Sequence, residues 1–374
     1  MVDLDEERAT LAARLHEEAM ALREAGTYPA ALATCDEAVV LFEDVEGDGS
    51  PNLANALIER GRILDGLDRH GDAEAALDRA LAILRPLLEP GEAADALDAE
   101  SLDELTRLTI RGEVARADVI RKQGRLQEGA AACQAALERA EASLPPTDLL
   151  VAEALNALGV IYKFAGRFAE AEPLYRRALT IVEANGLDGG EHLATLLHNL
   201  GGLAHSRGDF AAGEPLARRS VELRERTLGA GHPTVAADRE AWGALLEGLG
   251  RLPEAERAYR DALGTFEATL GPDSLEAASS LAALASLLQT AGRRDEALRC
   301  YERALAVREA KLGPAHFDVG LTLNNLGMLL EELGRRDEAR AVLGRAAAIF
   351  GTRLGPEHPH TRAATANLAA LTKG

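Results

Sequence analysis

LNALGVIYKFAGRFAEAEPLYRRALTIVEA, from Leu155 to Ala184, is the stretch that decides the fold. Before Gly166 its apolar residues recur at the spacing of one helix face, and a second such stripe runs from Phe168 to Ile181. The glycine between the two stripes interrupts the pattern. We therefore predict two helices joined by a tight turn, whose apolar stripes cannot both be buried within one hairpin.

The interrupting glycine recurs at a fixed interval. It stands at 42-residue steps along most of the chain, as Gly124, Gly166, Gly208, Gly250, Gly292 and Gly334. A small residue follows each of these glycines after five positions, and another follows after twelve. Small side chains at fixed points of the second helix let neighbouring helices approach closely, and a period in this range is the signature of stacked helical units. The sequence predicts an all-α solenoid of about eight helical hairpins.

The predicted organisation has four parts. Residues 1–88 hold two N-terminal hairpins, and residues 104–359 hold six regular 42-residue repeats. Between them, residues 89–103 are expected to form a longer loop or a helix extension, which is the best candidate for a hinge. Residues 360–374 are predicted to form a C-terminal capping helix, because their polar side chains suit the exposed end of a solenoid.

Single residues predict details of the hairpins. The second hairpin is expected to turn at Gly71, with Ala75 or Ala76 at its first small position. The connectors between later hairpins repeat a Leu-Gly pair, which predicts a helix end, and in three of four connectors a proline follows. The connector histidines are expected to form hydrogen bonds near the start of the next helix: His232, His316 and His358.

Charge and hydropathy narrow the class of partner. The 374-residue chain has 61 acidic and 41 basic residues, a formal net charge of -20, so nucleic acid is not an expected partner. Residues 1–150 alone carry 32 acidic and 15 basic residues, which we interpret as a solvated face, with a surface that steers a basic partner as the alternative. No run approaches 18 apolar residues and the N-terminus has no apolar core, so neither a membrane span nor a secretion signal is predicted.

The cysteines and catalytic motifs favour a non-enzymatic protein. Cys35, Cys133 and Cys300 are odd in number and far apart, which indicates small buried hydrophobes in a reducing compartment, the cytoplasm by default. No P-loop, nucleophile-elbow or H-E-x-x-H motif occurs. No catalytic residue, cofactor or metal is predicted. Trp242 is expected to pack between repeats and not to serve as a ligand platform.

Three histidines lie close together in the sequence: His192, His198 and His205. The last two are seven residues apart, about 10 Å along a helix, which is too far for them alone to chelate one zinc ion. A metal site would need a carboxylate from Glu153 or Glu240, so polar residues lining a groove are the favoured interpretation.

The opening stretch resembles a known family. Seven of its residues match the offsets of the tetratricopeptide repeat: Leu158, Gly159, Tyr162, Gly166, Ala171, Tyr175 and Ala178. The 42-residue period, with EAEPLYRRAL and LGPEHP, is similar to the kinesin-light-chain type of that repeat, and the resemblance covers residues 8–373. It implies a right-handed superhelix whose concave groove, lined by the first helices, binds an extended or short helical segment of a partner.

The resemblance also implies a ladder of asparagines, which stand just before a Leu-Gly or Leu-Ala pair and hold the partner's backbone. An amide offers both a donor and an acceptor for this purpose. The alternative is that these asparagines join adjacent helices. The ladder is broken at Glu240 and Ala282. The matching positions are Asn156, Asn199, Asn324, Asn325 and Asn367.

The remaining residues of the predicted groove are Lys163, His198, His205, Glu240 and Met328. A second family groove, which grips a C-terminal carboxylate with Lys or Arg, is not expected, because no such residue neighbours Asn199 or Asn325. Acidic residues on the later first helices favour a basic or polar partner segment.

The sequence therefore predicts a non-enzymatic adaptor or scaffold that holds a partner segment. The alternative is a regulatory sensor, in which a peptide or small ligand changes the superhelical pitch and so controls an effector protein. The abundance of Ala, Arg and Gly suggests a GC-rich bacterial genome. The sequence makes no prediction of the oligomeric state.

Overall fold

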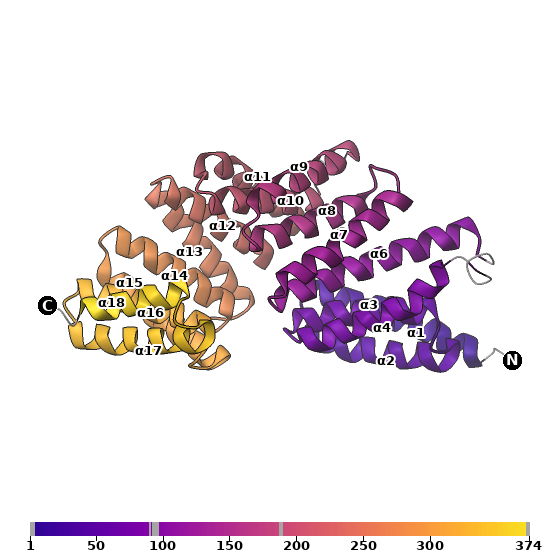
Figure 1. The fold of residues 1–374 in the computed structure, drawn as a ribbon, viewed down its shortest axis with the longest axis horizontal. Coiled ribbons are helices and arrows are strands. Elements are labelled where there is room, and N and C mark those ends of the chain that lie inside the picture. Colours follow the sequence, from indigo (N-terminus) through magenta and orange to yellow (C-terminus); the bar gives the residue numbers. More distant parts are fainter. Residues whose placement is uncertain (1–3, 90, 92–96, 187–189, 372–374) are drawn as a thin grey trace. The chain divides into compact units, whose positions relative to one another are not determined.

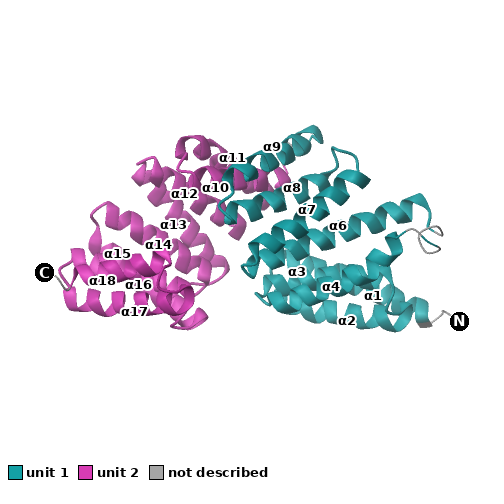
Figure 2. Cartoon of the chain, viewed as in Figure 1, with its two compact units in different colours: residues 1–188 teal, residues 189–374 magenta. Residues whose placement is uncertain are grey.

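The computed structural model describes residues 4–89, 91, 97–186 and 190–371. Those residues form seventeen α-helices and contain no strand. The helices follow one another as eight hairpins and a final single helix, which confirms the predicted all-α fold class. The chain divides into two compact units, residues 1–188 and residues 189–374 (Figure 2).

Unit 1 consists of four helical hairpins (Figure 1). In each hairpin the second helix packs along the first, and it also packs against the first helix of the next hairpin. The hairpins are α1 (Leu4–Glu24) with α2 (Tyr28–Glu46), α3 (Pro51–Gly66) with α4 (His70–Leu88), α6 (Ala99–Lys122) with α7 (Leu126–Ser143), and α8 (Leu149–Phe164) with α9 (Phe168–Ala184).

Unit 2 repeats this packing and ends with one additional helix. Its hairpins are α10 (Glu191–Ser206) with α11 (Phe210–Leu228), α12 (Pro233–Gly248) with α13 (Leu252–Thr269), α14 (Leu275–Thr290) with α15 (Arg294–Leu312), and α16 (Phe317–Glu332) with α17 (Arg336–Leu354). The final helix, α18 (Pro359–Ala370), packs on α17 as a first helix without its partner.

The hairpin turns explain why glycine recurs every 42 residues. In seven of the eight hairpins the turn glycine has a φ between 73° and 84°. Side chains rarely adopt this left-handed conformation, whereas glycine adopts it without steric cost. The connector glycines Gly229, Gly313 and Gly355 likewise cap their helices at φ of 84° to 85°, as the Leu-Gly pairs predicted.

The turn of the second hairpin differs from the prediction. Gly71 lies inside α4, and the residue with a positive φ is Asp68, at 58°. Asp68 follows Gly26 by 42 residues, so the second hairpin keeps the period of the array. The prediction was wrong because it required a glycine, whereas aspartate also enters the left-handed region when its side chain is free in solvent.

This register also fixes the small positions. All the alanines that stand five or twelve positions after the turn in the regular repeats are fully buried between helices. In the second hairpin these positions are Ala73 and Ala80, which are fully buried as well. The predicted Ala75 is exposed, and Ala76 is buried at a different register.

The predicted hinge segment lies partly outside the described residues, which omit 90 and 92–96. Helix α6 begins at Ala99, so the end of the segment 89–103 is a helix extension. Helices α4 and α6 on either side of the segment pack against each other. The hinge stays a prediction.

The first helices of successive hairpins lie side by side within each unit. In unit 1 the order is α1, α3, α6, α8, and in unit 2 it is α10, α12, α14, α16. We call these two layers the first-helix face of unit 1 and the first-helix face of unit 2. The second helices form the other layer of each unit.

The thiols are held apart inside the helical layers. Cys35 and Cys133 are fully buried and Cys300 is half-buried, and none of the three is in a disulfide. Burial raises the pKa of Cys35 and of Cys133 to about 12, so both act as small hydrophobic side chains. Among the described helices, none combines the length and the apolar character needed to cross a membrane.

Candidate functional site

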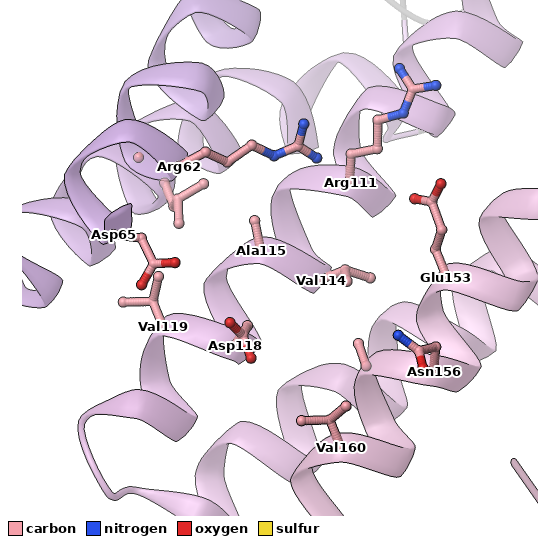
Figure 3. A pocket seen from close by; sticks show the side chains of 13 residues that line it. Arg62, Asp65, Arg111, Val114, Ala115, Asp118, Val119, Glu153, Asn156 and Val160 are labelled. Carbon is pink, nitrogen blue, oxygen red and sulfur yellow. The ribbon is translucent and has the colours of Figure 1, made fainter. Parts of the chain in front are cut away.

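A pocket of about 370 Å³ opens in the first-helix face of unit 1 (Figure 3). Its walls come from α3, α6 and α8, the first helices of three successive hairpins, with Leu77 of α4. Helix α3 approaches α4 closely here, because a Cβ on Gly61 would lie 2.7 Å from Leu77 Cγ. The pocket is therefore built by the stacking of repeats, since no single hairpin contains it.

The pocket combines an apolar wall with charged ends (Figure 3). Val114, Ala115 and Val160 provide part of the apolar surface. Arg62 and Arg111 extend into the pocket at one end. Sequence reasoning missed both arginines, because it examined only the neighbours of two asparagines in unit 2; their places on the first helices were the available signal.

Two acidic residues at the other end of the pocket are already neutralised. Lys122 Nζ lies 2.6 Å from an oxygen of Asp65. Arg121 Nε lies 2.8 Å from an oxygen of Asp118. The third acidic residue of the pocket, Glu153, forms no ion pair with the residues that the structure describes.

The structure separates the two residues predicted for the groove in unit 1. Asn156 lines the pocket from α8. Lys163 is half-buried one to two turns further along α8, where its Nζ lies 5.6 Å from the centroid of the Phe164 ring. Burial lowers the pKa of Lys163, and the nearby Arg121 guanidinium lowers it further.

A second pocket, of about 300 Å³, lies in the first-helix face of unit 2 between α14 and α16, with Tyr301 of α15. The predicted residues Asn325 and Met328 both line it. The Asn325 amide bonds to the Tyr301 hydroxyl, and burial raises the pKa of that hydroxyl to about 12. Glu332, at the rim, pairs with Arg294 at 2.8 Å.

The other ladder asparagines are engaged within the fold. Asn367 Nδ2 of α18 donates to Asn324 Oδ1 of α16 at 3.0 Å, which joins two first helices. Asn199 is only 8% exposed. The alternative interpretation, in which asparagines link adjacent helices, therefore describes Asn324 and Asn367, whereas Asn156 and Asn325 line pockets.

His198 belongs to a buried polar network in unit 2. Its Nδ1 lies 2.7 Å from Oδ1 of Asp238, which is 1% exposed. Asp238 also accepts hydrogen bonds from Ser220 Oγ at 2.5 Å and from Arg224 Nη1 at 2.7 Å. The available signal was Ser220, which stands at the small position that is alanine in the other regular repeats.

The last two predicted groove residues also have partners in the fold. The His205 ring packs against the Phe210 ring with 5.5 Å between centroids. Glu240 Oε2 accepts a hydrogen bond from Ser280 Oγ at 2.8 Å, and burial raises the pKa of Glu240. Among the residues that the structure describes, no three His, Cys, Asp or Glu side chains gather where they could hold a metal ion.

Two smaller predictions are confirmed. The Nδ1 atoms of the connector histidines accept hydrogen bonds from backbone N–H groups two residues later, at 3.2 Å in each case, so that each histidine caps the next helix: His232, His316 and His358. Trp242 packs between repeats, and its indole N–H donates to Glu214 Oε1 of the preceding α11 at 3.1 Å.

Stacked helical hairpins with pockets between successive first helices define a helical-repeat scaffold, a class typical of protein interaction and not of catalysis. Tetratricopeptide repeat family models match residues 10–85, 108–184, 192–267, 234–310 and 319–360. The chain belongs to the tetratricopeptide repeat family. No curated protein matches the sequence.

Solved structures share the fold at low sequence identity. A Rap protein complexed with Competence and Sporulation Factor has a TM-score of 0.57 and 18% identity over 98% of both chains. The apo form of RapI has a TM-score of 0.56 and 14% identity, over 80% of this chain and 97% of that one. A putative kinesin light chain of Podosopora anserina with nearly identical TPR-like repeats has a TM-score of 0.48 and 20% identity, over 55% of this chain and 96% of that one.

Proposed function

We propose that this protein is a non-enzymatic adaptor or scaffold that binds a segment of a partner protein on its first-helix faces. The observation that carries this proposal is the place of Asn156 and Asn325. Each lines a pocket between successive first helices, and each offers an amide that can bond to a peptide backbone. The Rap protein of similar fold was solved with a bound factor, which is in keeping with this function.

The basic or polar character of the partner segment is proposed for unit 2 alone. The pocket of unit 2 is lined by Gln289, Asn325 and Glu332. Glu332 and Gln289 are already hydrogen-bonded to each other at 2.7 Å, which reduces the negative charge that a basic segment would meet. A polar segment therefore suits this pocket better than a strongly basic one. The cytoplasm is the proposed location, because the three cysteines are separate thiols.

The proposal is tested by affinity purification of the tagged chain from its own host, followed by mass spectrometry. Asn156→Ala and Asn325→Ala are compared with Gln134→Ala, a matched loss of an amide on the second helix α7. We expect one of the two asparagine variants to retain about tenfold less of a partner, since a lost hydrogen bond in a desolvated site weakens binding by about 1 kcal/mol or more.

Partners retained equally by both asparagine variants, and lost in Gln134→Ala, would place the binding surface on the second helices. Circular dichroism of each variant serves as the folding control. Because Asn199 is buried and Asn324 is bonded to Asn367, these residues are unsuitable for the test, since their loss would change packing as well.

A ligand-responsive sensor is the second candidate. It is favoured by the fold likeness to the Rap protein solved with its factor, which extends over 98% of both chains. Small-angle scattering with and without the purified partner segment separates the two candidates. A change in the radius of gyration on binding supports the sensor, and an unchanged profile supports a static scaffold.

A further inference from the structure

We propose that the pocket in the first-helix face of unit 1 binds a carboxylate group of the partner segment, through the guanidinium groups of Arg62 and Arg111. This inference rests on the proposed function, because it names the chemistry of a segment bound at that face. The carboxylate would come either from an Asp or Glu side chain or from the C-terminus of the partner.

The first argument is that both guanidinium groups lack partners. Neither Arg62 nor Arg111 forms an ion pair or a hydrogen bond with any residue in the described part of the chain. Neighbouring arginines on the same helices are paired: Arg60 with Asp36 at 2.6 Å, and Arg116 with Asp78 at 2.5 Å. The free donors of Arg62 and Arg111 both lie in the pocket (Figure 3).

The second argument is the position of Arg62. Its side chain is half-buried on α3, and burial lowers its pKa because water is removed from the charged group. The charges of Arg23 and Arg111 lower that pKa further. Two unpaired positive groups in one pocket destabilise the empty site, and an anion placed between them relieves both the repulsion and the lost solvation.

The third argument is the charge balance of the pocket, which selects a single negative charge. Asp65 and Asp118 are neutralised by Lys122 and Arg121. The remaining groups are two guanidiniums and the Glu153 carboxylate, whose charge acts on Arg62. One carboxylate therefore completes the balance, whereas a doubly charged phosphate would face repulsion from Glu153.

The geometry of the groups also suits a carboxylate on a peptide. A guanidinium presents paired N–H donors that match the two oxygens of a carboxylate. Val114, Ala115 and Val160 form an apolar wall in the same pocket of about 370 Å³, which can accommodate the carbon chain of an amino acid. Asn156 lies in the same pocket and can bond to the adjoining backbone.

The test uses the full chain and a pool of synthetic nine-residue peptides of random sequence. In four sub-pools the central residue is fixed as Glu, Gln, Lys or phosphoserine, and each sub-pool is made with a free or an amidated C-terminus. Peptides retained on the immobilised protein are quantified by mass spectrometry. The variants are Arg62→Gln with Arg111→Gln, Glu153→Gln, and the control Arg176→Gln on the exposed surface of α9.

We expect retention of carboxylate-bearing peptides to exceed that of amidated Gln peptides by about tenfold, as for a charge-assisted hydrogen bond. The double arginine variant removes this preference, and Arg176→Gln keeps it. Glu153→Gln retains both arginines and strengthens the preference. A preference that follows the free C-terminus identifies the main-chain carboxylate, and one that follows Glu identifies the side chain.

Peptides retained without any carboxylate preference would overturn the inference and leave the proposed function standing. An equal preference in the double arginine variant, or a stronger preference for phosphoserine, would also overturn it. If no peptide is retained by any form of the protein, both the inference and peptide binding at this face are wrong. Thermal melting by circular dichroism checks that each variant is folded.

Discussion

Glu240 is a carboxylate held in a half-buried position on the first-helix face of unit 2. Burial raises its pKa, and the nearby charge of Glu276 adds to this effect, while the hydrogen bond from Ser280 and the charge of Arg308 oppose it. The folded protein therefore binds this proton more tightly than the unfolded chain does. Glu240 destabilises the fold above its folded pKa, and this penalty disappears as the pH falls below the unfolded value of 4.5.

We expect Glu240→Gln to raise the free energy of unfolding of unit 2 at pH 7 by about 1 kcal/mol, the equivalent of roughly one pKa unit. At about pH 4 the gain should vanish, because the wild-type carboxyl is then protonated in both states. Urea unfolding at the two pH values measures the difference.

The matched control is Glu170→Gln, an exposed carboxylate whose pKa is lowered by its hydrogen bond with Arg167. Because that shift has the opposite sign, this substitution should not stabilise the protein at pH 7. A gain for Glu240→Gln of equal size at both pH values would show that packing, and not charge, is responsible.

At the scale of helix pairs, glycines in the first helices allow the two helices of a hairpin to touch. A Cβ on Gly159 of α8 would lie 2.7 Å from Tyr175 Cε1 of α9. Tyr175 is fully buried and has no room to move aside. Gly243 and Tyr259 form the same contact in a hairpin of unit 2, where the distance would be 2.8 Å.

Gly159→Ala should therefore lower the free energy of unfolding by roughly 1–3 kcal/mol, the range for overpacking a buried contact. The control is Gly344→Ala in α17, where a Cβ would meet no heavy atom within 4 Å. That change should stabilise the helix by up to about 1 kcal/mol, because alanine is the better helix former. Thermal and urea unfolding measure both variants, and a similar loss for each would contradict the role of Tyr175.

At the scale of the whole molecule, the repeats of each unit contact mainly their neighbours, so local damage should stay local. Helix α18 covers the end of unit 2, where Ala364 is buried together with Phe350 and Val319. Leu371, just after α18, is buried in the adjoining core of unit 2. Trp242 is the single tryptophan of the sequence, so its fluorescence reports on unit 2 alone.

We expect deletion of residues 356–374 to move the Trp242 fluorescence transition to lower urea, through loss of roughly 2–4 kcal/mol of apolar burial. Part of the helical circular dichroism signal, contributed by unit 1, should keep its midpoint. A matched truncation that removes only residues 372–374 should change neither signal. Loss of the whole circular dichroism signal in one shifted transition would show that the two units unfold together.

The order of hairpins, their helix ends and the small contact positions could be predicted from the sequence, because each depends on backbone conformation and local spacing. A left-handed turn requires glycine in most sequences, and close helix packing requires alanine or glycine five and twelve positions later. Asp68 escaped this reasoning because a second residue type satisfies the same backbone requirement.

The chemistry of the first-helix faces was decided only by the tertiary structure. Asn156 and Asn367 match the same sequence pattern, yet one lines a pocket and the other bonds to Asn324 of a different repeat. Arg60 and Arg62 are two residues apart, yet only Arg60 has an acidic partner within the described residues. The availability of a polar side chain depends on neighbours that are tens of residues distant in sequence, whereas the hairpins depend on residues close along the chain. The sequence therefore determined the scaffold, and the packing of successive repeats decided which polar groups remain available to bind a partner.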